Sequence, residues 1–130
     1  MLSPLKGSNF KKLLESFGDE MKDVYPLLFV IDTVDQEVRV TSVGIIKNSK
    51  GEYLERIILF TEDNVKDLGM TVEGISSDVS TLIDVNNEQF PGIDQWPVYV
   101  SFNYSVGDNE VYGVFQNDDQ LVILAGGYLY

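Results

Sequence analysis

Two carboxylate pairs are the first residues to consider, because two carboxyl groups across a cleft can hydrolyse a glycosidic bond. Asp32 and Asp35 flank one expected turn, and Asp118 and Asp119 lie together in another. Such catalysis needs the two carboxyls about 5–9 Å apart across a cleft. Aspartate is also a common turn former, because its side chain bonds to nearby backbone. We therefore interpret both pairs as turn residues.

A second candidate is a calcium loop within residues 84–95. Asp84, Asn86 and Glu88 supply alternating oxygen ligands, as at the start of an EF-hand loop. The sixth position of that motif should be glycine and is Gln89, and the twelfth should be glutamate and is Gln95. The match fails at both informative positions, so no metal site is predicted.

The chain contains no histidine and no cysteine. It therefore lacks an imidazole general base, both common nucleophile pairs, and the usual nitrogen and sulfur ligands of zinc or copper. Gly126-Gly127 has no following helix and no lysine, so it does not form a phosphate-binding loop. We expect a non-catalytic protein without a cofactor.

Charge divides the chain into two unequal parts. Lys66 is the last positive residue, and residues 67–130 carry ten carboxylates against no cation. The first 66 residues hold nine cations and eleven acids, a balance of −2, and the remainder accounts for −10 of the total of −12. Such a segment repels nucleic acid and acidic membrane surfaces and attracts basic surfaces.

The length of 130 residues is typical of one domain, so we expect a single acidic domain spanning 1–130. Hydrophobic residues make up 44% of the chain, which is a globular composition. No apolar run approaches the ~20 residues of a membrane span, and the first residues do not resemble a secretory signal. We expect a cytoplasmic protein that does not bind membranes.

Hydrophobic periodicity predicts the elements. A helix is expected over 8–24, capped by Ser8, followed by three strands, one or two short helices, and three further strands. The apolar parity changes between Val40 and Val43, which indicates a bulge. The expected strands are 27–33, 38–47, 53–60, 96–105, 111–115 and 121–125, and the expected second and third helices are 61–69 and 75–85.

Short links within each set of three strands favour antiparallel meanders. The predicted fold is therefore α+β, with an antiparallel sheet of about six strands in the order α-βββ-α(α)-βββ and the helices on one face. In strand 96–105 successive side chains alternate between the two faces of the strand. The apolar residues are expected to face the core, and the other face is polar and includes Tyr99. Tyr99, Tyr128 and Tyr130 are expected to be exposed.

These observations predict a non-catalytic binding protein that inhibits or neutralises a basic partner, as toxin-immunity and phage anti-defence proteins do. The partner would be a nuclease or another nucleic-acid-binding protein, held by carboxylates and a tyrosine anchor, with no direct contact to nucleic acid. The acids lie in turns and loops, so they are expected to form an extended rim. The predicted contact residues are Asp94, Tyr99, Asp108, Glu110, Asp118 and Asp119.

Two alternatives remain open. An acidic, dimeric chaperone or assembly adaptor could hold an apolar client through an exposed sheet face or strand edge. A small phage structural component would have the same composition. The oligomeric state, monomer or homodimer, is left open by the sequence.

Overall fold

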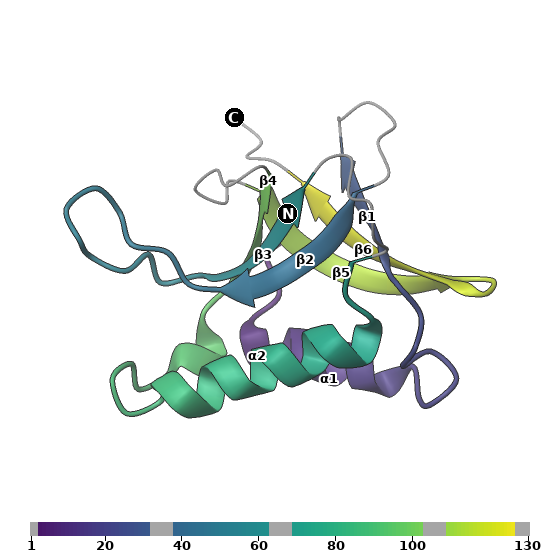
Figure 1. Ribbon diagram of the computed structural model, residues 1–130, viewed down its shortest axis with the longest axis horizontal. Coiled ribbons are helices and arrows are strands. Elements are labelled where there is room, and N and C mark those ends of the chain that lie inside the picture. Colours follow the sequence, from purple (N-terminus) through teal and green to yellow (C-terminus); the bar gives the residue numbers. More distant parts are fainter. Residues whose placement is uncertain (1–2, 32–37, 63–68, 103–108, 127–130) are drawn as a thin grey trace.

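The computed structural model describes residues 3–31, 38–62, 69–102 and 109–126, which form two helices, a short 3-10 helix and one six-stranded sheet (Figure 1). The chain is therefore α+β, as predicted. In order along the chain the elements are α1 (Gly7–Ser16), β1 (Leu27–Ile31), β2 (Arg39–Gly44), β3 (Ile57–Glu62), α2 (Val72–Asn86), η1 (Ile93–Gln95), β4 (Val98–Phe102), β5 (Asn109–Asn117) and β6 (Gln120–Gly126).

The prediction of an antiparallel meander sheet is correct only in part: β4, β5 and β6 form an antiparallel meander, but the sheet as a whole is mixed. The strand order is β1-β6-β5-β4-β3-β2, and two of the neighbouring pairs, β1 with β6 and β3 with β4, are parallel. Hairpins join β2 to β3 and β5 to β6, as expected from their short links. Local link length predicts hairpins, but it carries no information on how separate hairpins pair with one another.

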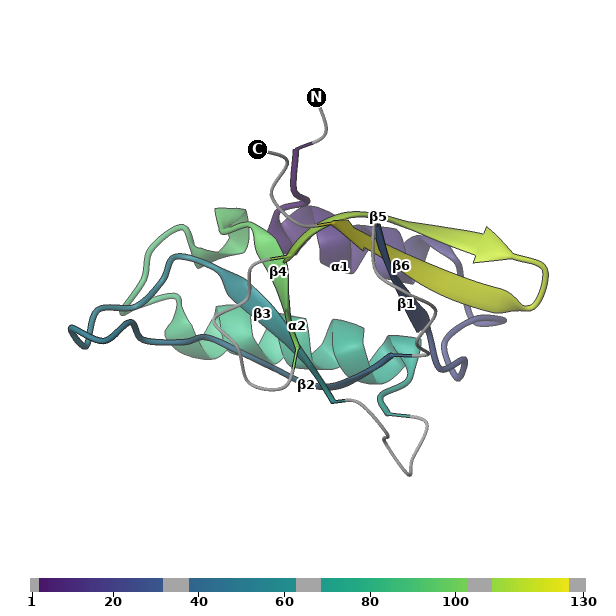
Figure 2. The same cartoon turned by 90° about the horizontal axis from the view of Figure 1, so that it is seen from above.

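The sheet is also strongly curled. Leu28 of β1 forms an antiparallel bridge with Val38, next to β2, and its N–H donates to the Val38 carbonyl at 3.1 Å. The first and last strands of the order therefore touch (Figure 2).

An N-terminal residue completes the sheet where β4 and β5 separate. Only two residue pairs join these strands within the described residues, Tyr99 with Glu110 and Val100 with Asn109. Beyond them Leu5 lies between the strands: its N–H donates to the Val111 carbonyl and its carbonyl accepts from the Val98 N–H, both at 2.8 Å. The N-terminal segment therefore satisfies backbone groups that β4 and β5 would otherwise leave unpaired.

Both helices pack on one face of the sheet (Figure 1). Phe10 and Leu14 of α1 and Ile75 and Val79 of α2 are at most 1% exposed. These helix residues pack against every second residue of the strands, because successive side chains of a strand point to opposite faces. All six strands contribute to this core. The strand residues of this core are Val40, Ile57, Leu59, Val98, Val100, Val111, Val114, Leu121, Ile123, Ala125 and Leu28.

The first helix is shorter than predicted, ending at Ser16 rather than near residue 24. Gly18 adopts a φ of +79°, a conformation that glycine reaches at little cost and that commonly terminates helices. The residue at the N-cap is Lys6 instead of Ser8, and its side chain makes no capping hydrogen bond.

The second helix begins earlier than predicted. It starts at Val72 rather than at 75, and the Thr71 side chain caps it by accepting the Gly74 N–H at 3.0 Å. No helix begins at Thr61, because Thr61 and Glu62 end β3. The rest of the predicted helix 61–69 lies almost entirely outside the described residues.

The long connection between β2 and β3 extends away from the sheet (Figure 1, left). A turn forms between the predicted strands 38–47 and 53–60: Gly51 has a φ of +80°, and the Asn48 side chain accepts N–H groups of Lys50 and Glu52. The predicted bulge is confirmed as well, because the β2–β3 register shifts between Val40 and Ser42.

Gly69 is the glycine with the strictest requirement. Its φ is +78°, and an added Cβ would lie 2.5 Å from the Val40 carbonyl oxygen and 2.9 Å from the Arg39 Cβ. The close approach places the neighbouring Met70 N–H 2.8 Å from that same carbonyl, which anchors the chain entering α2 on β2.

Gly69→Ala should therefore destabilise the fold more than Gly51→Ala. Both positions need a left-handed backbone, which costs about 1–2 kcal/mol for alanine. At Gly51 a Cβ meets nothing within 4 Å, whereas at Gly69 it meets backbone, so we expect a total of about 3 kcal/mol or more. Urea unfolding of the two variants measures the difference, and equal losses would contradict the contact at Gly69.

Candidate functional site

The face of the sheet turned away from the helices has two unlike halves. Over β3 and β4 it is buried by the chain's own side chains, with Ile58, Tyr99 and Ser101 at most 6% exposed. Over β5, β6 and β1 it exposes Phe29 and Phe115, with 54% and 46% of their surfaces accessible. This exposed half is the candidate site.

Tyr99 belongs to the buried half, so the prediction that it is exposed is wrong. Only 6% of its surface is accessible, although it alternates with core residues as predicted. The Arg56 guanidinium lies over its ring, 4.2 Å from the centroid. Ile58 and Ser101, on the same face, are fully buried. Alternation distinguishes the two faces of a strand, but a central strand can be buried on both.

Glu110 is held by two tyrosines beside Tyr99. The Tyr99 hydroxyl donates to Oε1 at 3.1 Å, and the Tyr112 hydroxyl donates to Oε2 at 3.0 Å. The β5–β6 register shifts between Val111 and Gly113, and this bulge accompanies the placement of Tyr112 on the same side as Glu110. Glu110 is half-buried and has a fixed carboxylate direction, unlike a freely solvated rim residue.

The exposed half forms what we call the sheet-face patch: Leu27, Phe29, Phe115, Val122 and Leu124. Strand register places these residues in two adjoining rows, because paired residues in a ladder point to the same face. Leu27 pairs with Val122, which pairs with Phe115. In the next row Phe29 pairs with Leu124, which pairs with Gly113. Three strands therefore present one continuous apolar surface.

The turn between β5 and β6 lies at one end of the patch. Asp118 and Asp119 are exposed in this two-residue turn, and Asp118 has a φ of 56°. Gln116 closes the turn by donating through Nε2 to the Asp118 carbonyl at 2.8 Å. The geometry agrees with the interpretation of this pair as turn residues, and the β5–β6 turn extends away from the centre of the sheet (Figure 1, right).

The six predicted contact residues do not form one rim. Glu110 and Asp118 lie eight residues apart along β5, about 26 Å at the usual strand rise. Asp94 lies in η1 on the helical side, where its carboxylate accepts the Gln95 side-chain amide at 3.0 Å. Asp108 lies outside the described residues, as do Asp32, Asp35, Tyr128 and Tyr130.

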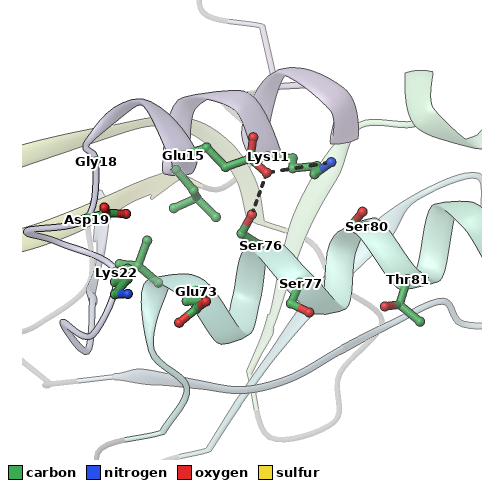
Figure 3. A pocket seen from close by; sticks show the side chains of 12 residues that line it. Lys11, Glu15, Gly18, Asp19, Lys22, Glu73, Ser76, Ser77, Ser80 and Thr81 are labelled. Carbon is green, nitrogen blue, oxygen red and sulfur yellow. Dashed lines mark hydrogen bonds and ion pairs between the residues drawn. The ribbon is translucent and has the colours of Figure 1, made fainter.

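A hollow of about 450 Å³ lies between α1 and α2, on the other side of the molecule (Figure 3). Lysines, acids and hydroxyls alternate on its walls, and Glu15 accepts from Ser76 at 3.2 Å while pairing with Lys11 at 3.7 Å. No buried side-chain nitrogen or oxygen in the described ranges lacks a partner, so no buried polar group points to a ligand in this hollow. We do not assign a site to this hollow.

The segment 84–95, considered and rejected above as a calcium loop, begins inside a helix. Asp84 and Asn86 lie in the last turn of α2, where Asn86 donates to the Leu82 carbonyl at 2.8 Å. Among the described residues no group of three or more acids is arranged to hold a metal ion. In the same part of the chain, no helix has the length and apolar character required to cross a membrane.

Comparison with known proteins gives no relative: no family model, no curated protein and no solved structure matches this chain. The candidate site therefore rests on the geometry of this chain.

Sequence reasoning missed Phe29 and Phe115 for an identifiable reason. Phe29 lies in a continuous apolar run, which favours a strand buried on both faces. Phe115 ends the expected strand 111–115 without a clear alternation. The one sequence signal for Phe115 is an aromatic residue on the strand that leads into the Asp118–Asp119 turn. Phe29 is far away in the sequence, and only the pairing of β1 with β6 brings it onto the same surface.

Tyr99→Phe should destabilise the protein by about 0.5–1.5 kcal/mol, because it removes one donor to the Glu110 carboxylate and leaves the ring in place. The double variant with Glu110→Gln should cost less than the sum of the two single variants, because both changes affect the same hydrogen bond. Thermal unfolding of the four proteins in this cycle measures the coupling. If the two losses of stability simply add in the double variant, the hydrogen bond between Tyr99 and Glu110 does not contribute to stability.

Proposed function

We propose that this protein is a non-catalytic binding protein that neutralises a basic partner protein by covering its functional surface. The observation that carries the proposal is the sheet-face patch beside the Asp118–Asp119 turn. Exposed aromatic residues next to solvated carboxylates suit a protein interface with an apolar centre and a charged edge. A toxin-immunity or anti-defence protein that blocks a nucleic-acid-binding enzyme belongs to this class.

The apolar part supports a macromolecular partner. Phe29 and Phe115 expose about half of their surfaces although they belong to regular strands with buried neighbours. Aromatic residues contribute strongly to interfaces because they bury a large area and lose little conformational freedom. The patch is a broad surface on three strands rather than an enclosed cavity, which suits another protein surface better than a small substrate.

The charge supports a basic partner. Residues 67–130 include β5 and β6 and contain no cation, so the acids near the turn have no positive neighbour in that segment. An acidic field accelerates encounter with a basic surface and opposes binding of acidic ones. The nucleic-acid-binding surface of a nuclease is basic because it must hold phosphates. Its lysines and arginines would meet these carboxylates.

Replacing the two exposed aromatics tests the apolar part. The partner is first captured from a host lysate, identified and purified, and its binding is then measured by calorimetry. Phe29→Ser and Phe115→Ser should each weaken binding by tenfold or more, because exposed aromatic anchors commonly contribute over 1 kcal/mol. Both side chains are half-exposed, so folding should change little.

Val85→Ser is the matched control, because Val85 is 74% exposed but lies on α2, in the helical layer. It should bind as tightly as the natural chain. Equal losses in all three variants, or none in the two aromatic ones, would place the interface elsewhere.

Neutralising the turn tests the electrostatic part. Asp118→Asn with Asp119→Asn should lower the association rate constant by about three- to tenfold at low salt, with a smaller effect on dissociation. Asp78→Asn with Glu88→Gln removes the same charge from exposed positions of the α2 region and should have a weaker effect. Stopped-flow mixing at two salt concentrations measures both pairs. Equal effects would mean that net charge alone steers the partner.

The same patch also favours a second candidate, a chaperone or adaptor that holds an apolar client. The distinguishing property is salt dependence, because an apolar contact is not weakened by screening. If binding to the captured partner depends on Phe29 and Phe115 but is equal at low and high salt, the second candidate replaces the first.

A further inference from the structure

Gly113 is an open position within β5. Glycine there lacks a side chain for packing and weakens the strand. It is not among the glycines with positive φ in the described residues. Apart from its chain neighbours Tyr112 and Val114, no atom lies within 4 Å of a Cβ placed on it.

Gly113 lies at the β5–β6 bulge, and a strand glycine can mark both a bulge and the close approach of another group. The open space above Gly113 is on the far face of the sheet, since Gly113 pairs with Leu124 in the sheet-face patch. We call this space the Gly113 notch. Its floor is the Gly113 backbone with the Leu124 side chain, and exposed Phe29 and Phe115 lie on two sides of it.

Carboxylates lie in both directions along β5 from the notch. Glu110 pairs with Gly126, and Gly113 pairs with Leu124. Because Gly126 lies two residues beyond Leu124 on β6, the two pairs are about 7 Å apart along the strand. Its direction is set by the hydroxyls of Tyr99 and Tyr112. Asp118 lies on the other side, beyond Phe115.

We propose that the Gly113 notch receives an arginine side chain of the partner, with its aliphatic stem on Gly113 and Leu124 and its guanidinium against the Phe115 ring. This inference rests on the proposed function and deepens it, because it names the side chain that the patch recognises. The step is non-covalent, and the carboxylates along β5 supply the charge that favours the cation.

Three features favour arginine over an aliphatic or an ammonium side chain. A planar guanidinium stacks on an aromatic face and is more weakly hydrated than an ammonium group. An arginine presents an apolar stem and a charged head, matching the apolar floor and the flanking carboxylates. The same sheet face already holds such a contact, since Arg56 stacks over Tyr99 with 4.2 Å between guanidinium carbon and ring centroid.

The test uses small probes, so it does not depend on identifying the partner. N-acetyl-arginine methylamide is titrated into the ¹⁵N-labelled full chain at millimolar concentration, and amide shifts are followed by NMR. Saturable shifts at Gly113 and Leu124 are expected. N-acetyl-lysine methylamide should bind more weakly, and N-acetyl-norleucine methylamide, which has the stem without the charge, should bind at least fivefold more weakly.

Gly113→Val places a branched side chain in the notch and should weaken arginine binding at least tenfold; its Cβ meets no atom within 4 Å apart from the chain neighbours. Valine is favourable in strands, so this variant should fold at least as well as the natural chain. Gln116→Val is the matched control: Gln116 is an exposed position of the same strand that pairs with the core residue Leu121. It should bind the probe normally.

The outcomes separate this inference from the proposed function. If the arginine probe causes no saturable shift at Gly113, or if norleucine binds equally well, the arginine notch is overturned. The proposed function then still stands if Phe29→Ser and Phe115→Ser weaken binding of the purified partner. If those variants bind the partner normally while the probe binds in the notch, the notch holds and the proposed interface fails.

Discussion

The parallel pairing of β3 with β4 is the constraint on which the structure depends. Two consecutive parallel strands cannot be joined by a hairpin, so the chain must cross a face of the sheet between them. Helix α2 makes that crossing, with Ile75 and Val79 buried against the sheet. The helical layer is thereby placed on one face, and α1 packs beside α2 on the same side.

The far face follows from this arrangement. Central strands β3 and β4 are buried on both faces, and side chains such as Arg56 and Phe60 cover the far side there, the latter packed on Gly44. Strands β5, β6 and β1 have no helix on this far face, where Phe29 and Phe115 remain exposed while Val122 between them is buried. A surface of this kind on a strongly acidic chain is costly in stability and solubility unless it is used, which is why binding is the favoured function.

Local features of the fold could be predicted from sequence. Asn48 and Gly51 form their turn, and the parity change after Val40 marks a bulge, because such signals depend only on nearby residues. The helix ends were less predictable. Gly18 lies inside the predicted helix 8–24, but its positive φ follows the end of that helix at Ser16. Thr71 caps a helix that begins at Val72, three residues before the predicted start at 75.

The amino-acid sequence by itself determined the charge asymmetry, the absence of histidine and cysteine, and the α+β class, because these depend on composition and short-range periodicity. Only the tertiary structure decided which strands are neighbours. Pairing β1 with β6 brings Phe29 beside Leu124, across 96 residues of chain, and pairing β4 with β5 buries Tyr99 against Glu110. Contacts of this kind arise from long-range packing, so exposure of a given aromatic residue cannot be deduced from its own strand.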